Sequence, residues 1–443
     1  MERLFSCFSR ARWIFIGFAV LAVGFRAVSQ AAFFRTEMTD FTVYLAAGEA
    51  LREGRDPYSI VTSRGWHFIS PIASAALFAP LTRLPVGLAS AIWYILNIAF
   101  LVGTILLALD LLVDHDCVTV PRRIWGIPLL LLSGPIIVTL SRGQWSLLIG
   151  FLLTLGWWCY LKKRDFSCGF YFGLAATLKL LPLIFGIYLV GKRRWISLSG
   201  FIVALAVGGV LMPGVFVKWQ RIPPLYREFA RLVVSPSLTG ERSQLYNELL
   251  SPILKRNQSI SAVTSRVFVG ARLTNQRAAW IRVQKTVTLL ADILLMAAAA
   301  VVLSRKRAAR IATLEAAEVG LVSCLMLFVS PVSWSHYYAL LLLPLLLLAG
   351  AATRLVEAPF SPRTAARVLA AIFAIVAIHE ISPTAQVYGA LLAAGIIIFI
   401  SCWCWLWRSR QVFMHDAWPE IGEHERRAPD GCVQTPSPSC EAS

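Results

Sequence analysis

The sequence is short of charged residues, and acidic ones are the scarcer kind. Only 15% of the 443 residues are Asp, Glu, Lys or Arg, whereas 57% are hydrophobic. A soluble protein of this size needs a more polar surface than this composition can supply. Apolar runs of about 18 or more residues recur from end to end of the chain, and each is long enough to cross a bilayer. The sequence therefore predicts an all-α, polytopic integral membrane protein.

The excess of positive charge does not indicate a nucleic-acid-binding protein. Lys and Arg outnumber Asp and Glu by 42 to 24, which gives a formal net charge of +18. The basic residues stand in short clusters between apolar runs, at 162–164, 192–194 and 305–307. Such clusters are typical of the cytoplasmic loops of membrane proteins. We expect membrane lipids around the chain and no nucleic acid among its partners.

Metal-binding and disulfide patterns are also missing. The nine cysteines show neither metal-site spacing nor a disulfide framework. Cys402 and Cys404 lie inside an apolar, Trp-rich run, where packing is the simpler role. No internal repeat is visible, which weighs against the inverted-repeat transporters. We predict no metal and no cofactor.

Twelve apolar segments are candidates for membrane spans. The first, at 13–34, follows a short basic N-terminus and is long for the apolar part of a cleaved signal peptide. The polar tail 408–443 is expected to be disordered and cytoplasmic, so that residues 1–407 form one membrane domain. The other segments lie at 69–82, 87–112, 124–141, 144–161, 167–190, 195–217, 285–303, 314–333, 336–355, 366–382 and 387–407.

Between ten and twelve of these segments cross the membrane completely, and the sequence allows either number. If all twelve cross, the cluster Lys162–Arg164 faces outward, against the positive-inside rule. If 69–82 and 167–190 are re-entrant, every basic cluster lies inside, and prolines and a lysine do interrupt these two segments. Both versions put Asp40 and the polar region 218–284 on the outer face.

The first outer loop contains the most informative stretch. Asp40 begins a helix whose apolar residues recur at helical spacing from Phe41 to Leu51. Glu49, Arg52 and Glu53 occupy the other face, so this helix is expected to lie along the membrane surface. By pattern alone, Asp40 is also explained as a helix N-cap.

Three further polar positions each have a functional and a structural interpretation. Lys179 lies in an apolar stretch, where it either serves a site or pairs with Asp110 or Asp292. His336 is either a site residue or part of an interfacial aromatic belt. Asn257 begins a glycosylation sequon, although such matches often have no meaning.

A collinear set of motifs resembles glycosyltransferase family 87, whose members are GT-C-type membrane mannosyltransferases that use polyprenyl-phosphate mannose. The set covers roughly residues 36–350. Its motifs are Asp40-Phe41-x-x-Tyr44, Gly54-x-Asp56-Pro57-Tyr58, Gly143-Gln144, Leu178-Lys179-x-x-Pro182, Lys192-Arg193-Arg194-Trp195, Asn257-Gln258-Ser259 and Ser330-Pro331-x-Ser333-Trp334-x-His336. Two positions depart from the family pattern. Ile69-Ser70-Pro71-Ile72 stands where Tyr-Pro-Pro is common, and Trp145-Ser146 stands where an Asn usually follows Gly-Gln.

The resemblance implies an inverting transfer of a sugar, mannose, from a polyprenyl-phosphate donor to a lipid or glycan acceptor on the outer face. It implies Asp40 as the base that deprotonates the acceptor hydroxyl. A lipid or polysaccharide flippase is the alternative, but a transporter would bury its acid near the bilayer midplane. The residues expected to bind the donor phosphate or the substrate are Arg55, Asp56, Tyr58, Gln144, Lys179, Arg256, Asn257 and His336.

Overall fold

A computed structural model describes residues 19–29, 40–61, 65–113, 123–239, 254–269, 277–305 and 310–415. Within these ranges the chain is helical and has no β-strand, only two isolated bridges, Val61 with His67 and Asn257 with Trp334. The all-α fold expected from the composition is confirmed. The predictions for the basic N-terminus, for residues 240–253 of the large polar region and for the tail from residue 416 lie outside the described ranges.

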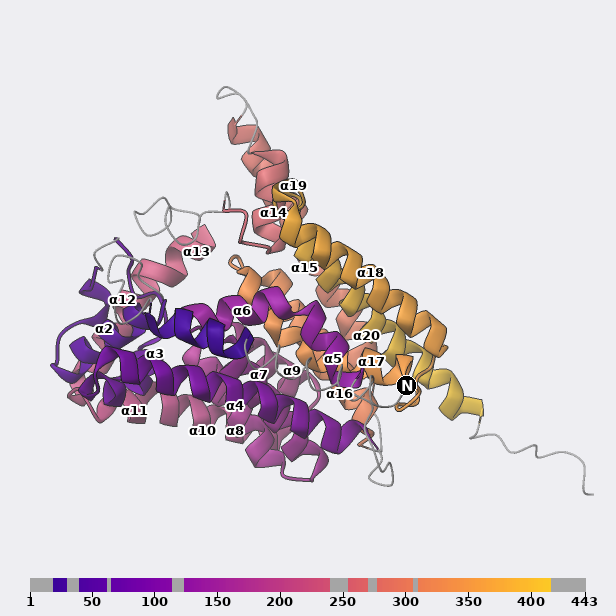
Figure 1. The fold of residues 1–443 in the computed structure, drawn as a ribbon, viewed down its shortest axis with the longest axis horizontal. Helices are drawn as coiled ribbons and strands as arrows, with labels where there is room; N and C mark the ends of the chain where they lie inside the picture. The colour runs from indigo at the N-terminus through magenta and orange to yellow at the C-terminus, as the bar shows by residue number, and fades with distance from the viewer. Residues whose placement is uncertain are drawn as a thin grey trace, which may run out of the picture.

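The apolar segments of the sequence form the long helices of the bundle (Figure 1). Seven described helices are long and apolar enough to cross a bilayer. They are α4 (Val86–Leu112), α10 (Trp195–Ala206) continued by a π-helical turn η4 (Val207–Leu211) into α11 (Met212–Gly214), α15 (Arg277–Leu303), α16 (Ala312–Val329), η9 (Ser335–Leu341) with α17 (Leu342–Ala352), α18 (Pro362–Ile381) and α20 (Ala390–His415). Helix α20 continues past Arg408, where the polar tail was expected to begin.

Shorter apolar helices account for the remaining predicted segments, so each of those segments contains at least one apolar helix. The shorter elements are the helix Ala19–Ser29, α3 (Ile72–Phe78) with η2 (Ala79–Arg83), α5 (Arg123–Leu131) with α6 (Ser133–Arg142), α7 (Ser146–Leu161), and α8 (Asp165–Leu178) with η3 (Leu181–Leu183) and α9 (Ile184–Gly191). Loop elements complete the part of the chain that the structure describes. They are α2 (Asp40–Arg52), η1 (Pro57–Ser59), η5 (Trp219–Arg221), α12 (Ile222–Phe229), η6 (Ala230–Val234), α13 (Ser235–Thr239), α14 (Ile260–Phe268) and α19 (Pro383–Val387).

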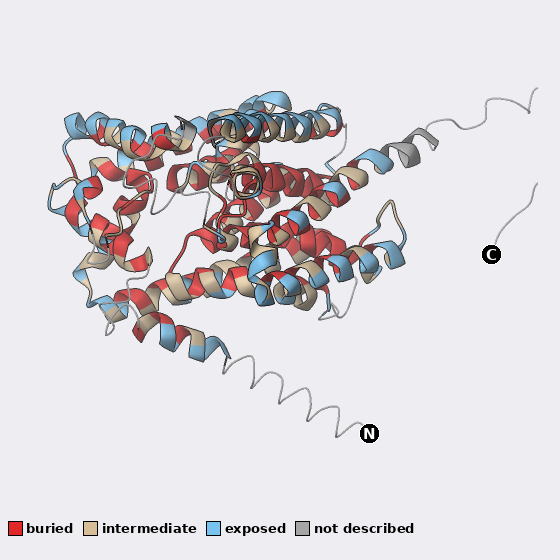
Figure 2. Ribbon diagram, turned by 90° about the horizontal axis from the view of Figure 1, so that it is seen from above, coloured by how far each residue is buried: buried red, intermediate tan, exposed pale blue. Residues whose placement is uncertain are grey.

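The centre of the bundle is formed by α16 and α17. Buried residues make up 83% and 89% of these two spans, against 11% for α15, which lies at the periphery. Figure 2 shows buried residues filling the interior while the outer faces of the peripheral helices stay exposed. Both central helices are buried on nearly all sides by the surrounding helices, and the two acids of α16, Glu315 and Glu318, are paired with Arg194 and Lys192. Helix η9 begins the second of them and carries site residues into this interior.

The predicted segment 167–190 forms a broken hairpin. Helix α8 stops before Lys179, whose backbone is extended (φ −153°, ψ 142°), and η3 and α9 lead the chain back. Pro182 lies in η3 and lacks the amide hydrogen that would continue a helix. The interruption that the sequence showed at Lys179 is therefore the tip of the hairpin.

Contacts at the open end of this hairpin hold its two arms together. Arg310 forms an ion pair with Asp165, the first residue of α8, at 2.8 Å. The ring of Tyr160 lies under both Arg310 and Arg194, at 4.1 and 3.8 Å from the ring centre. Arg194 lies in the turn between α9 and α10 and also pairs with Glu315 at 2.9 Å. The loops before α8 and after α9 therefore lie at the same end of the bundle, which we call the basic end.

This arrangement favours one of the two membrane topologies. If 167–190 crossed completely, the clusters at 162–164 and 192–194 would lie on opposite sides of the membrane. The structure instead places both at the basic end, as expected for a re-entrant segment. Basic clusters that gather at one end of a bundle follow the positive-inside rule.

Helices α5 and α6 show a bend that the sequence analysis did not predict. The predicted segment 124–141 is broken into two helices at an angle of 69°. Pro128 lies inside α5, and Gly134 and Pro135 begin α6. Prolines remove helical hydrogen bonds and are the usual cause of such a kink. Arg142 ends α6 and is followed by Gly143 in the left-handed conformation (φ +68°).

Helix α2 is embedded more deeply than a surface helix. Eight of its 13 residues are buried, and it packs along α3 and η2. A Cβ at Gly48 would come within 2.9 Å of backbone atoms of Phe78 and Ala79, so only glycine allows this close approach. Glu49, Arg52 and Glu53 are exposed, as predicted. The polar face of the predicted helix is confirmed, whereas its apolar face is covered by protein.

Candidate active site

A polar cavity of about 460 Å³ lies where α2, α6, the tip of the α8 hairpin, the loop before α14 and η9 meet. These elements are far apart in the sequence, and each contributes polar side chains to the wall. Of the predicted site residues, the cavity brings together Asp40, Gln144, Lys179, Arg256 and His336. The other lining residues are Val43, Tyr44, Trp66, His67, Ile69, Ser70, Arg142, Leu254, Lys255, Trp334, Tyr337 and Gln386.

Asp40 opens α2 and faces the cavity. Its Oδ2 atom is buried and has no hydrogen-bond partner among the described residues. Burial raises the pKa of this carboxyl above its usual value, while Arg142, Gln144 and Lys179 oppose the shift. A carboxylate with a raised pKa and a free oxygen is suited to accept a proton from a substrate.

An aromatic cluster holds Asp40 and Gln144 in place. The hydroxyl of Tyr44, one turn after Asp40, donates to Oε1 of Gln144 at 3.0 Å. The Tyr44 ring packs on Trp145 with 4.7 Å between ring centres. Trp93 donates from Nε1 to the Gly143 carbonyl at 2.9 Å. Buried rings with satisfied polar atoms fix their neighbours firmly, so the acid and the amide keep a defined relative position.

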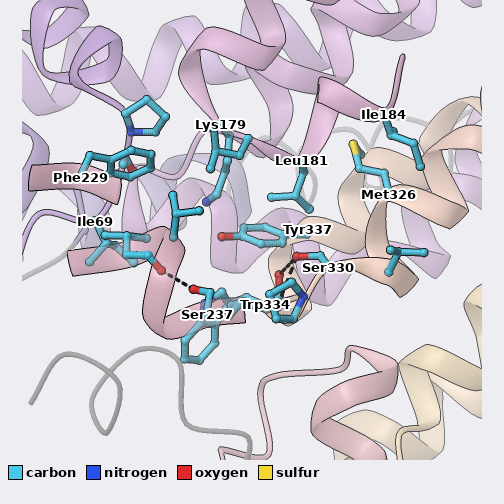
Figure 3. A pocket seen from close by; sticks show the side chains of 18 residues that line it. Ile69, Lys179, Leu181, Ile184, Phe229, Ser237, Met326, Ser330, Trp334 and Tyr337 are labelled. Atoms are coloured by element: carbon cyan, nitrogen blue, oxygen red, sulfur yellow. Dashed lines mark hydrogen bonds between the residues drawn. The ribbon is translucent and has the colours of Figure 1, made fainter. Parts of the chain in front are cut away.

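Three cations surround Asp40, from three different elements. Lys179 stands 4.0 Å above the centre of the Tyr337 ring, and the two side chains point toward one another in Figure 3. Arg142 ends α6, and Arg256 lies in the loop before α14. The nearby Arg142 lowers the pKa of Arg256, with burial as the second cause. Two guanidinium groups this close repel each other, and a bound anion would remove that repulsion.

Lys179 is not neutralised by Asp110, one of the two acids that the sequence offered as its partner. Asp110 forms an ion pair with Lys162 at 3.5 Å and accepts a hydrogen bond from Trp158 at 2.8 Å, away from Lys179. Within the described ranges, the side chains of Lys179, Arg142 and Arg256 make no hydrogen bond or ion pair. The cavity therefore offers unsatisfied positive charge to a ligand.

His336 closes the cavity from η9. It is 5% exposed, and its ring meets Tyr337 edge to face with 4.5 Å between ring centres. Its Nε2 atom is buried without a partner in the described part of the chain. This burial argues against the interfacial-belt interpretation and leaves one ring nitrogen for a ligand.

A second, apolar cavity of about 310 Å³ adjoins the polar one. The two share Ile69, Ser70, Lys179, Trp334 and Tyr337. Figure 3 shows Phe229, Leu181, Ile184 and Met326 around the apolar cavity, with Lys179 at its boundary. The remaining lining residues are Pro71, Leu180, Val233, Val234, Ser237, Val329, Ser330, Pro331 and Val332. A molecule that spans both cavities needs a charged part and a hydrocarbon part.

Four residues singled out by the resemblance do not line the polar cavity. Arg55 is 56% exposed and pairs with Glu53 at 2.6 Å. Asp56 caps η1 by accepting from the Tyr58 amide at 2.9 Å. The Tyr58 hydroxyl donates to the Ser70 carbonyl at 3.2 Å. Asn257 is buried and bonds to backbone groups. The predicted binding role thus has no geometric support at these positions, which shape the loops instead.

Trp66, His67 and Gln386 line the cavity but were not singled out from the sequence, and Arg142 was noted there without an assigned role. Arg142 stood beside the Gly143-Gln144 motif, and that adjacency was the available signal. Trp66 and His67 come from a loop, and Gln386 lies in the short helix α19. No hydrophobic period marks such positions in a loop or in a helix of five residues.

The fold and the cavity together define the class of the protein. It is a polytopic helical membrane protein in which a polar cavity, lined by one acid and four basic side chains, adjoins an apolar cavity at Lys179. The chain belongs to glycosyltransferase family 87, whose family model matches residues 68–331. The protein is therefore a membrane glycosyltransferase, and the flippase alternative is not favoured.

Curated relatives from mycobacteria support this assignment. The chain is 25% identical over 363 residues to the polyprenol-phosphate-mannose-dependent alpha-(1-2)-phosphatidylinositol mannoside mannosyltransferase of Mycobacterium tuberculosis (strain ATCC 25618 / H37Rv), covering 76% of this chain and 75% of the relative. It is 26% identical over 313 residues to the corresponding pentamannoside mannosyltransferase of Mycolicibacterium smegmatis, covering 68% and 64%. No solved structure shows significant similarity to this chain.

Proposed function

We propose that this glycosyltransferase moves mannose from polyprenyl-phosphate mannose to a lipid-linked acceptor, with inversion at the anomeric carbon. The observation that carries the proposal is the junction of the two cavities at Lys179. A polyprenyl-phosphate sugar has a sugar phosphate for the polar cavity and a hydrocarbon chain for the apolar one. The names of the mycobacterial relatives specify the same donor and a phosphoinositide glycolipid as acceptor.

The reaction needs a base and a cationic site for the leaving group. Asp40 takes the proton from the acceptor hydroxyl while the hydroxyl oxygen attacks the anomeric carbon of the donor sugar. The bond from that carbon to the phosphate oxygen breaks, and polyprenyl phosphate leaves from the opposite face of the sugar. Lys179, Arg256 and Arg142 offset the negative charge that develops on the phosphate. No nucleotide is needed, because the lipid phosphate is already a good leaving group.

The two cavities suit different parts of the substrates. The prenyl chain fits the apolar cavity between Ile184, Phe229 and Met326. Trp66 and Gln386 line the polar cavity and not the apolar one. The indole of Trp66 offers a face on which a sugar ring of the acceptor can pack.

We place the reaction on the extracytoplasmic side. The clusters at 162–164 and 192–194 lie together at the basic end. The positive-inside rule assigns that end to the cytoplasm. Helix α8 has 14 residues and spans about 21 Å between the basic end and Lys179. The polar cavity is therefore separated from the basic end by much of the bilayer thickness.

A transfer assay tests the proposal directly. Membranes containing the protein are supplied with polyprenyl-phosphate mannose labelled in the sugar, together with a phosphatidylinositol mannoside acceptor. We expect a new labelled glycolipid that is absent from membranes containing the Asp40→Asn variant. If the label crosses the bilayer without forming a new product, the protein is a flippase. If only a nucleotide sugar supports transfer, the donor assignment is wrong.

The pH dependence of transfer follows from the raised pKa of Asp40. A base acts in its deprotonated form, so kcat/KM for the donor should fall as pH decreases through this pKa. Because burial raises the pKa, the decline begins at a higher pH than for an ordinary Asp, whose pKa is about 3.9. A pH profile of initial rates, with thermal unfolding recorded at each pH, checks this. A flat profile down to about pH 4 with the protein still folded contradicts it.

A further inference from the structure

The glycosylation sequon Asn257-Gln258-Ser259 is buried. The three residues are 1%, 0% and 0% exposed. The Asn257 amide nitrogen, which a glycan would modify, donates to the Pro331 carbonyl at 3.2 Å. A glycan is bulky and needs a surface position. This stretch therefore has a different role from the one its sequence pattern suggests.

The Asn257 side chain joins two segments that are remote in the sequence. Its Oδ1 atom accepts from the Ser333 amide at 2.9 Å and from the Ser259 amide at 3.2 Å. Together with the bond to Pro331, one side chain makes three hydrogen bonds to backbone. An amide side chain can make four hydrogen bonds, and the three that Asn257 makes restrict the arrangement of its surroundings. Removing such a group leaves buried backbone atoms unsatisfied.

A short backbone pairing continues the connection on both sides of Asn257. The Gln258 amide donates to the Ser333 carbonyl at 2.7 Å, and the Ser335 amide donates to the Arg256 carbonyl at 3.0 Å. These bonds make an antiparallel bridge between Asn257 and Trp334. Arg256 therefore comes immediately before the bridge in the first segment, and His336 follows the bridge by two residues in the second.

Both partners of this bridge deliver side chains to the polar cavity. Arg256 lines it from the first segment, and Trp334 and His336 line it from the second. Lys179 stands over Tyr337, the next residue after His336. The position of the Arg256 guanidinium relative to Lys179 thus depends on the pairing that Asn257 fixes. Cations that hold a phosphate must keep their geometry closely, since a shift of about 1 Å can cost about 100-fold in rate.

We propose that Asn257 is a positioning residue for the donor phosphate. It does not touch substrate, and it acts by holding Arg256 and the segment 333–337 at a fixed separation across the cavity. The proposal rests on the proposed function, since it assigns the phosphate of the donor to these cations. The Asn257→Ala variant should lose about 10- to 100-fold in kcat/KM for the donor. Its KM for the acceptor should stay near that of the wild type.

A matched control separates positioning from general stability. Gln284 is 8% exposed, and its amide nitrogen makes three contacts, to Ser261, Thr264 and Thr288, at 3.0 to 3.3 Å. It does not line the polar cavity. Gln284→Ala should lower the thermal unfolding midpoint about as much as Asn257→Ala and leave the kinetic constants unchanged. Equal losses of donor kcat/KM in the two variants would show that Asn257 acts only through stability.

A double-mutant cycle decides whether Asn257 acts through Arg256. The rates of Asn257→Ala, Arg256→Ala and the double variant are measured with the donor at low concentration. If Asn257 serves to place Arg256, the double variant should be no slower than Arg256→Ala. If the two losses multiply, the proposal is overturned.

A milder substitution keeps the test available if Asn257→Ala does not fold. Asn257→Ser keeps a neutral oxygen that can accept a hydrogen bond at this position and buries no charge, whereas a carboxylate would face the Pro331 carbonyl. It should show a smaller rise in donor KM, and that rise should vanish in the Arg256→Ala background. A rise that persists there overturns the proposal. If no variant transfers mannose because the donor is a different lipid-phosphate sugar, the wild type will be inactive as well, and that result counts against the proposed function alone.

Discussion

The Asp40→Asn variant will fold and insert as the wild type does but will lose about 10²- to 10⁴-fold in transfer rate. Asn has the same shape as Asp and caps a helix equally well, so the start of α2 should be preserved. It cannot take a proton from a hydroxyl group. The measurement is kcat for mannose transfer by purified protein, alongside the thermal unfolding midpoint. The buried, unpaired Oδ2 atom of Asp40 is the structural reason for expecting the loss.

The neighbouring acid of the same loop provides the control for this experiment. Asp56 caps η1 and does not line the polar cavity. Asp56→Asn should therefore retain most of the transfer rate. If Asp40→Asn transfers mannose at a near-normal rate, Asp40 is a helix cap and no more. The base must then be sought at His336, whose Nε2 atom is also buried without a partner among the described residues.

The Lys179→Met variant will lose about 10²- to 10³-fold in kcat, the range found when one group that stabilises developing charge is removed. Met keeps the length and the apolar stem of Lys, so contact with the Tyr337 ring can be preserved. Lys179 is the only charged residue among the described residues that both cavities share, and the variant loses this charge. Lys179→Arg should recover part of the rate because it restores the charge with a different shape.

A second cation tests whether position, and not total charge, accounts for this effect. Arg55 was expected from the sequence to bind phosphate, yet it is exposed and pairs with Glu53. Arg55→Ala should leave kcat and the donor KM within about twofold of the wild type, as expected for an exposed ion pair. If Arg55→Ala and Lys179→Met are equally slow, the phosphate lies nearer the loop surface than the cavity indicates.

The helical framework could be predicted because it follows from local rules. Each apolar segment is long enough to be recognised by composition alone, and the break at Lys179 was visible as a charge beside Pro182. The bend between α5 and α6 had an equally local signal in Pro128 and Pro135, which was not used. The depth of α2 could not be inferred, because its covering comes from α3 and η2.

The candidate site was predictable in part for a different reason. The resemblance supplied Asp40, Lys179 and His336, and the structure brings all three to one cavity. It could not separate residues that face the cavity from residues that shape the backbone. Asn257 belongs to a motif as much as Lys179 does, but its contacts with Pro331 and Ser333 are made across more than 70 positions of sequence. Only the folded chain shows whether such a residue faces the cavity or shapes the backbone.

The length of α8 sets the depth of Lys179 in the bilayer. One end of the hairpin of α8 and α9 is tied to the basic end by Arg310 and Arg194, and the other carries Lys179. Each residue of α8 therefore adds about 1.5 Å to the distance between the basic end and Lys179. Adding or removing a single residue there would turn the tip by about 100° and move the lysine off the junction. Eight of the 14 residues of α8 are buried, so its sequence can vary only on the exposed face. The length of the helix is set by the distance from the anchor to the phosphate.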